Sequence, residues 1–436
     1  MGKRIAAIVV IYLFACVAWF FLGGTVATRT SNFNARLLGE VEALWGTAQA
    51  QPSPELVFER KVKRIDKEWV SVPGTKKQKL VEKERWEWVT QPVILDKSHL
   101  DVNFDLEHRN KGLFWYSTYV VDFDGRYSYQ HVSEYDGFLS ITYRFPTQRA
   151  SYENFRFAVN DQVDPQITPE ARNGEKVVVQ RVPVKKGDVV PFELAYRSRG
   201  MDWWRYNFGS DVNRIKNFEL VMSTNFESID FPAGTISPTS KVATDDGWEL
   251  KWEFDNLISG FEVGMQMPEK MNPGPLAAQI SFFAPVSLGF FFLWMFVITL
   301  LRRIELHPIN YLFLAAAFFA FHLLFAYTVD HLPVLTAFGI CSAVSVFLVV
   351  SYLRLVVGLR FAALEAGGSQ LLYLVFFSYA HFIDGLTGLI VTIGSIVTLF
   401  LVMQLTGRIR WGEKFAGPAA PPPAIPDTRR TATATP

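Results

Sequence analysis

Residues 306–331, LHPINYLFLAAAFFAFHLLFAYTVDH, decide the fold class of this chain. Between His307 and Pro308 at one end and Asp330 at the other, the run contains one histidine, His322, and no charged residue. Since a helix rises 1.5 Å per residue, about 20 apolar residues cross a hydrocarbon core of about 30 Å. Proline is tolerated in the first turn of a helix, where its missing N–H needs no partner. The stretch therefore predicts a membrane-spanning helix that starts after His307.

Five further apolar runs of similar length occur in the chain. They lie at residues 5–24, 280–301, 332–353, 367–383 and 388–406. We therefore expect an integral membrane protein with six α-helical spans, namely an N-terminal transmembrane helix in residues 1–27 and a five-helix transmembrane block in residues 279–411. The first run also fits a secretory signal, but it exceeds the usual signal core of about 7–15 residues, which favours an uncleaved span. Residues 412–436, rich in Pro, Ala and Thr, predict a disordered cytoplasmic tail.

Basic residues in the short segments between these runs predict the orientation. Lysine and arginine occur on one set of these segments: Lys3, Arg4, Arg302, Arg303, Arg354, Arg360, Arg408, Arg410 and Lys414. The other set contains Asp330, His331 and Asp384 and no basic residue besides histidine. The positive-inside rule therefore predicts that both termini are cytoplasmic. Residues 28–278, inserted between spans one and two, are then expected in the periplasm of a bacterium with two membranes.

The region at residues 28–278 is predicted to be mainly β. Trp248, Leu250, Trp252 and Phe254 alternate with charged residues, a period of two that indicates a half-buried strand. Residues 113–123 are aromatic and β-branched on both faces, as expected of a central strand. Both cysteines of the chain lie inside apolar runs, so this region contains none. A disulfide framework and a cysteine-based zinc site are thereby excluded there.

An ordered set of short motifs resembles the CreD family of bacterial inner-membrane proteins. The motifs are Trp45-Gly46, Arg109-Asn110-Lys111-Gly112, Gly247-Trp248, His307-Pro308 with Tyr311-Leu312, Ser351-Tyr352-Leu353-Arg354 and Arg408-Ile409-Arg410-Trp411. Residues 51–54 depart from the family pattern, which indicates a divergent branch. The resemblance implies an inner-membrane protein linked to envelope integrity, responding to cell-wall stress and altering sensitivity to some colicins. It implies no catalytic residues.

Two groups of polar residues near the spans are candidate sites. His322 lies in mid-span, where an ionisable residue suggests transport or signalling, although a neutral imidazole that hydrogen-bonds between helices is the favoured interpretation. Asp330, His331, His381 and Asp384 combine the ligand types of a divalent metal ion. We favour wetted hairpin turns for these four residues, and we expect no metal and no cofactor.

Two segments of the β region are candidate contact surfaces. Trp203, Trp204 and Arg205 combine aromatic and guanidinium groups that suit lipid head groups, glycans or a partner protein. Use of the tryptophans in the core is the favoured alternative. Residues 60–88 mix acidic and basic side chains around a Pro-Gly turn and predict a solvated hairpin.

The function expected from the sequence is that of a non-enzymatic inner-membrane protein that supports or senses envelope integrity under stress. No nucleophile-elbow, zinc-protease, Cys-x-x-Cys or phosphate-loop motif occurs. Two alternatives stay open: a transporter or channel component with the C-terminal helices as its pathway, and a membrane-bound enzyme acting on a cell-wall lipid or glycan. The expected partners are the lipid bilayer and periplasmic or envelope proteins, lipids or glycans. With 43 basic and 42 acidic residues, the charge balance gives no reason to expect nucleic acid.

Overall fold

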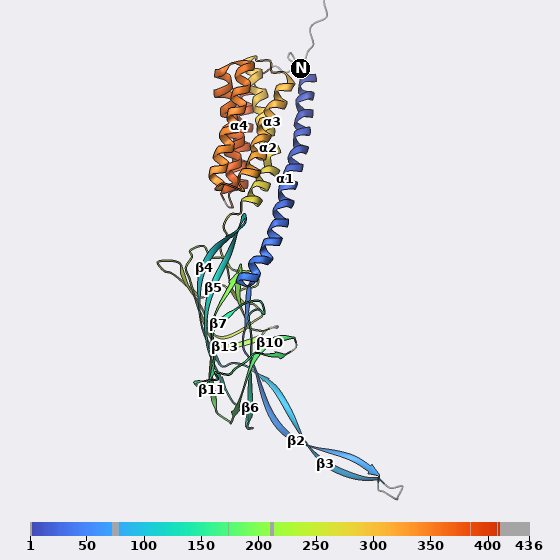
Figure 1. Ribbon diagram of the computed structural model, residues 1–436, viewed down its shortest axis with the longest axis vertical. Coiled ribbons are helices and arrows are strands. Elements are labelled where there is room, and N and C mark those ends of the chain that lie inside the picture. Colours follow the sequence, from blue (N-terminus) through green and yellow to red (C-terminus); the bar gives the residue numbers. More distant parts are fainter. Residues whose placement is uncertain are drawn as a thin grey trace, which may run out of the picture. The chain divides into compact units, whose positions relative to one another are not determined.

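A computed structural model describes residues 2–71, 78–172, 174–209, 213–383, 385–407 and 409 (Figure 1). The chain divides into two compact units. We call Met1–Asn32 together with Asn272–Pro436 the membrane unit, and Phe33–Met271 the β unit. The predicted tail at residues 412–436 lies outside the described residues.

Among the described residues, six helices are long and apolar enough to cross a membrane, and all lie in the membrane unit except residues 33–45 of the first one. They are α1 (Gly2–Trp45), α2 (Pro273–Arg302), α3 (Pro308–Thr328), α4 (Val334–Val357), a composite helix (Phe361–Phe382) and α7 (Thr387–Thr406). All six apolar runs of the sequence are thus helical. In chain order α1 precedes every strand and the other five helices follow the last one.

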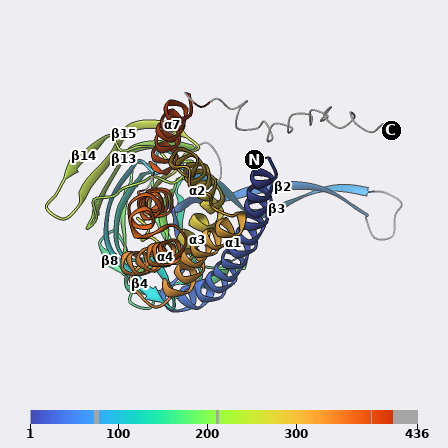
Figure 2. The ribbon, with the colours of Figure 1, turned by 90° about the horizontal axis from the view of Figure 1, so that it is seen from above.

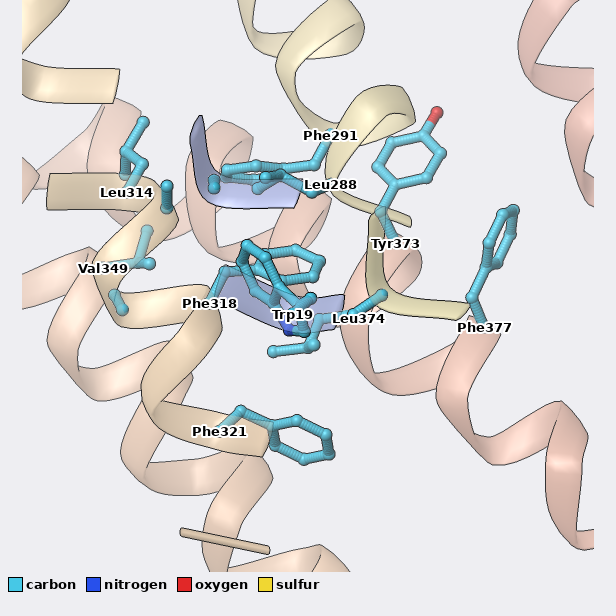
Figure 3. Packing of buried hydrophobic residues seen from close by; sticks show 14 of the residues in the cluster. Trp19, Leu288, Phe291, Leu314, Phe318, Phe321, Val349, Tyr373, Leu374 and Phe377 are labelled. Carbon is cyan, nitrogen blue, oxygen red and sulfur yellow. The ribbon is translucent and has the colours of Figure 1, made fainter. Parts of the chain in front are cut away.

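Aromatic side chains fill the interior of the membrane unit. Trp19 of α1 is buried and packs edge-on against Phe318 and Phe319 of α3, with ring centroids 6.2 and 5.2 Å apart. Figure 3 shows Trp19 and Phe318 at the centre of this cluster, with Leu374 of the composite helix beside them. Because lipid tails are as apolar as these side chains, such close packing rather than the hydrophobic effect holds the helices together.

The composite helix is wound irregularly. Its parts are η1 (Phe361–Ala366), α5 (Gly367–Gln370), η2 (Leu371–Phe376), α6 (Phe377–Tyr379) and η3 (Ala380–Phe382), of which η1 and η2 are π-helical and η3 is a 3₁₀ turn. The predicted span began at residue 367, six residues too late. Two π-helical segments in one helix are unusual, because π turns are rare. Where π turns do occur, they are often found at functional sites.

The β unit is built from three sheets, of which the largest has eight strands. In spatial order they are β14 (Ser240–Ala243), β15 (Trp248–Ser259), β13 (Asn213–Thr224), β4 (Lys97–Lys111), β5 (Phe114–Gln130), β11 (Val189–Met201), β7 (Tyr152–Val159) and β8 (Gln162–Val163). Neighbours are antiparallel except β13 and β4, which are parallel. The predicted central strand is confirmed, because β5 pairs with β4 on one side and β11 on the other.

Two smaller sheets complete the unit. One is antiparallel and contains, in order, β3 (Gln78–Val93), β2 (Glu55–Ser71), β6 (Gly137–Arg144), β10 (Glu175–Val184) and β9 (Glu170–Arg172). The other contains β1 (Gln49–Pro52), β12 (Trp203–Asn207) and β16 (Val263–Gln266). All three sheets contribute to one core, with Ile141, Leu220 and Trp204 as fully buried examples. The alternating strand at Trp248–Ser259 buries Leu250 and Trp252, as expected from its period of two.

The predicted boundary of the β region at residue 28 is wrong. Helix α1 continues without a break to Trp45, and its residues 33–45 belong to the β unit, where Val41 packs against Phe114 and Tyr116. Polar residues after Ala27 end the apolar run. A prediction based on the length of that run therefore stops there, although the helix continues as an amphipathic one. Gly46 terminates it with φ +88°, and a Cβ at this position would meet the carbonyl oxygen of Arg199 at 2.5 Å.

Candidate functional site

His322 lies in the aromatic interior of the membrane unit. It is 1% exposed, and the rings of Trp19, Phe318 and Phe321 surround it at centroid distances of 5.0 to 5.9 Å. Its Nδ1 lies 3.0 Å from the Phe318 carbonyl oxygen, so Nδ1 carries the proton and donates it. Its Nε2 has no hydrogen-bond partner in the described part of the chain, and no ion pair there involves His322. A proton relay needs a second titratable group in reach, so this geometry favours the packing role.

A second buried polar group, which the sequence reasoning missed, joins three helices. Gln370 of α5 is 0% exposed and donates from Nε2 to the Ser345 hydroxyl of α4 at 2.8 Å. Ser345 in turn donates to the Ala317 carbonyl oxygen of α3 at 2.8 Å. Gln370 lies directly between the two π-helical segments. The signal available in the sequence was the polar stretch Gly367-Gly368-Ser369-Gln370 within an apolar run.

Three of the four residues considered as metal ligands lie in the described part of the chain, and each has its own surroundings. Asp330 is bound instead by Arg29 of α1, whose guanidinium lies 2.9 Å from Asp330 Oδ2 and also donates to the Ala326 carbonyl oxygen at 3.1 Å. His381 is buried against the Phe283 ring at 5.1 Å.

One of the two remaining members of that group is described by the structure. His331 is exposed, and Asp384 lies outside the described residues. Among the residues that the structure describes, no three His, Cys, Asp or Glu side chains are grouped to hold a metal ion. Arg29 follows the first apolar run closely in sequence, but only the fold shows which carboxylate it meets.

The segment around Trp203 belongs to the core of the β unit. Trp204 is fully buried and contacts the rings of Phe104 and Phe123 at 5.7 and 6.3 Å. Arg205 lies over the Trp203 ring at 4.7 Å and pairs with Glu262 at 3.2 Å. The core interpretation is therefore confirmed for Trp204. Arg205 is paired within the unit and offers no free cation to a ligand.

Asp202, directly before this strand, is an unusual carboxylate. Its backbone has φ +68°, its N–H donates to the Ser117 carbonyl oxygen at 3.0 Å, and its own carbonyl accepts from Met267 N at 2.8 Å. Burial, followed by the negative charges of Glu269 and Glu42, raises the pKa of Asp202 to about 6. No sequence motif indicates this shift, because it depends on how deeply the fold buries the side chain.

Two buried glutamines connect the sheets of the β unit. Gln51 of β1 accepts from the hydroxyls of Tyr143 and Tyr196 at 3.1 and 2.8 Å. Gln49 donates to the Ser198 hydroxyl at 2.9 Å. Burial raises the pKa of each tyrosine hydroxyl well above the ordinary value for tyrosine. Both hydroxyls therefore stay protonated and donate their hydrogen bonds to Gln51. The network fixes β1 between the larger sheets and contains no activated nucleophile.

Strands β2 and β3 extend beyond the sheets as a two-stranded arm. From Arg60 onward, β2 pairs only with β3 in the described part of the chain, and Figures 1 and 2 show the pair running away from the other strands of the β unit. We call residues 60–71 and 78–89 the arm. Ion pairs join its strands, among them Lys67 with Glu82 at 3.3 Å and Arg64 with Glu87 at 3.0 Å. The predicted solvated hairpin is therefore confirmed.

One face of the arm carries large exposed apolar side chains. Trp69 and Trp86 are 63% and 64% exposed, and Ile65 is also exposed. Ile65 and Trp69 are odd-numbered residues of β2, and Trp86 is paired with the odd-numbered Lys63, so alternation along the strands places all of them on one face. Trp88 lies on the same face nearer the sheets, with the Arg181 guanidinium 4.6 Å from its ring. On this face, which we call the aromatic face, the exposed tryptophans are interspersed with the ion pairs Lys63–Glu84 and Lys67–Glu82.

Comparison with known proteins was made for the whole chain. Residues 1–412 match the protein family described as "Inner membrane protein CreD". No curated protein matches the sequence. Among solved structures, a proposed nutrient-binding protein from Legionella pneumophila is 11% identical, with 45% of this chain and 71% of that chain covered and a TM-score of 0.32. That likeness is too weak to indicate a shared fold.

Proposed function

This chain belongs to the CreD family of inner membrane proteins, and from that premise we propose that it is a non-enzymatic protein that supports or senses the state of the cell envelope. In this proposal the six helices span the inner membrane with both termini in the cytoplasm. The β unit then lies in the periplasm and contacts an envelope component, which is a protein, a lipid or a glycan. The distribution of basic residues over the short loops supports this orientation.

The aromatic face of the arm is the observation that carries the proposal. A two-stranded ribbon without a third strand is only marginally stable in water, and large tryptophans are usually buried. Burying one tryptophan removes about 150–250 Å² from water, worth several kcal/mol at about 25 cal/mol per Å². Trp69 and Trp86 are mostly exposed. Exposed tryptophans gathered on one face are typical of a surface that binds a partner.

The membrane unit supports a scaffold role more than a catalytic one. Its deep polar contacts, Gln370 to Ser345 and His322 to a backbone carbonyl, join neutral groups. The Gln370 contact fixes two helices relative to one another, whereas the His322 bond to Phe318 lies within α3, and neither contact moves a charge. The acidic residue considered at the helix ends, Asp330, is neutralised by Arg29.

The test is complementation of a deletion strain. Deleting the gene should raise sensitivity to detergent and β-lactams, and the wild-type gene should restore resistance. A Trp69→Ala/Trp86→Ala variant should be produced at normal level and fail to restore it. The matched control, Val242→Ala/Ile258→Ala, removes exposed apolar side chains elsewhere on the β unit and should restore it fully. No change in sensitivity on deletion would refute the envelope role, whereas full restoration by the tryptophan variant would exclude the arm.

A transporter or channel component is the second candidate, and the winding of the composite helix favours it. Irregular helices with a buried polar residue at the break are common in transport pathways, and Gln370 occupies such a position. Gln370→Leu should then abolish function while the protein still folds. Complementation by His322→Ala tests the other deep residue, and full rescue would count against any relay through that histidine.

A further inference from the structure

We propose that the membrane unit binds one anionic phospholipid between α1 and α2, with its phosphate group at Arg4 and Arg303 and an acyl chain in the adjoining groove. This inference concerns the membrane unit alone and does not rest on the proposed function. Two neighbouring hollows carry it, one polar and cationic and one apolar.

The first hollow, the head-group cavity, has a volume of about 650 Å³ and lies where α1, α2 and α3 meet at their basic ends. Arg4, Thr299, Arg303 and His307 line it together with one carboxylate, that of Glu305. Neither Arg4 nor Arg303 forms an ion pair within the described part of the chain, whereas the neighbouring Arg302 is paired with Glu365 at 2.7 Å. The cavity therefore presents two unpaired guanidinium groups to whatever enters it.

The state of Arg4 points to a ligand that accepts hydrogen bonds. Its side chain interacts with the buried Tyr311 hydroxyl, but its Nε forms no hydrogen bond among the described residues, so a bound acceptor would complete its hydrogen bonding. A phosphate oxygen is such an acceptor, and guanidinium groups bind phosphates with paired, charge-assisted hydrogen bonds. Basic pockets between membrane helices are accordingly suited to lipid head groups.

The second hollow, the acyl groove, has a volume of about 300 Å³ and an apolar lining. Its lining includes Ile5, Val9, Tyr12, Gly289, Leu293 and Phe296. Ile5 follows Arg4 directly, and Phe296 lies one helical turn from Thr299, so the groove continues the cavity along both helices. From Arg4 to Tyr12 the helix rises about 12 Å, which is a substantial part of one bilayer leaflet.

Tyr12 and Gly289 shape the acyl groove away from the head-group cavity. The Tyr12 hydroxyl donates to the Pro285 carbonyl oxygen at 3.0 Å. A Cβ at Gly289 would lie 3.2 Å from that hydroxyl, so the missing side chain keeps the groove open. A cationic cavity that leads into an apolar groove matches a phospholipid, whereas free phosphate would use only the first hollow.

The experiment measures lipids retained by the full-length protein. The protein, purified in mild detergent, is exchanged into vesicles of equal parts phosphatidylglycerol and phosphatidylcholine and re-extracted, and bound lipid is counted by native mass spectrometry. Wild type should retain phosphatidylglycerol about ten-fold or more over phosphatidylcholine. Arg4→Gln/Arg303→Gln should abolish this preference. Lys3→Gln/Arg302→Gln, a control with the same loss of charge, should keep it, and equal loss in both variants would overturn the site.

A second pair of variants tests the acyl groove. Val9→Trp fills the groove and should remove the retained lipid, while Val10→Trp, at the adjacent and more exposed position, should not. Both positions face outward, so neither change disturbs the buried core. Undiminished retention in Val9→Trp would refute the groove. Displacement of the lipid by about 10 mM inorganic phosphate alone would show that the cavity recognises free phosphate, which also contradicts the proposal.

Discussion

Replacing Asp202 with asparagine should stabilise the β unit at alkaline pH and leave it unchanged at acid pH. The fold raises the pKa of this carboxyl from 3.8 to about 6, mainly by burial and further through Glu269 and Glu42. Asparagine has nearly the same shape, tolerates the left-handed backbone at this position and carries no charge. The substitution therefore removes only the penalty of burying the carboxylate.

The sign and size of the effect follow from the two pKa values. A carboxyl with a higher pKa in the folded state binds its proton more tightly when the protein is folded. Its favourable contribution to the free energy of unfolding is therefore complete below pH 3.8 and is lost as the pH rises through 6. A shift of this size corresponds to roughly 3 kcal/mol. Because Asp202 is only partly buried, solvent screening reduces it, and we expect about 1 to 1.5 kcal/mol. For a unit of this length that is a rise of about 2–5 °C in Tm.

The assay is thermal unfolding of the full chain in detergent, followed by tryptophan fluorescence, since most of the 12 tryptophans lie in the β unit. The difference in Tm between Asp202→Asn and wild type should be a few degrees at about pH 8 and close to zero at about pH 3, below the ordinary pKa of 3.8. Asp161→Asn is the matched control, because Asp161 also has a positive φ, +60°, but is exposed. The reasoning fails if the gain is the same at both pH values or if Asp161→Asn shows the same pH dependence.

Three further outcomes are expected from contacts in the two units. A double-mutant cycle with Arg29→Met and Asp330→Asn should give a coupling free energy of about 1 kcal/mol in detergent unfolding, because the pair is partly buried; strict additivity would contradict the contact. Gly200→Ala should lower unfolding free energy by about 1–3 kcal/mol, since its Cβ would lie 2.5 Å from the Tyr119 ring; an unchanged Tm would refute this. Trp252→Phe should cost about 2 kcal/mol, because the buried indole N–H donates to a backbone carbonyl at 2.7 Å; Tm within 1 °C of wild type would show that this bond contributes little.

The elements that the sequence predicted correctly are those with a local cause. A lipid bilayer requires about 20 apolar residues in succession, so all six runs are visible in the sequence and all six are helices. The strand at Trp248–Ser259 is visible for a similar reason, because one face is buried and the other is wet. In both cases the position of each residue, in lipid, in the core or in water, follows from the hydrophobicity of that residue alone.

The elements that sequence reasoning missed depend on contacts between distant residues. The second half of α1 is amphipathic and becomes recognisable only once Val41 has Phe114 to pack against. The sequence favours a wetted turn at Asp330 but does not identify its partner Arg29, which lies 301 residues earlier. Gln370 and Ser345 are 25 residues apart on different helices. The sequence shows that such side chains are polar, but only the fold shows which groups are their hydrogen-bond or ion-pair partners.

The placement of polar groups in the membrane unit argues for a scaffold over a pathway. A pathway for ions or protons needs charged or titratable groups that face one another through the depth of the bilayer. Here the deep groups are neutral and hold helices together, as Gln370 and Ser345 do, and the imidazole of His322 is enclosed by aromatic rings. At the two ends of the first apolar run, Arg29 is bound to Asp330 and Arg4 lies in the head-group cavity. Charges confined to the helix ends anchor a bundle in the bilayer, which is the arrangement that a protein acting through its β unit requires.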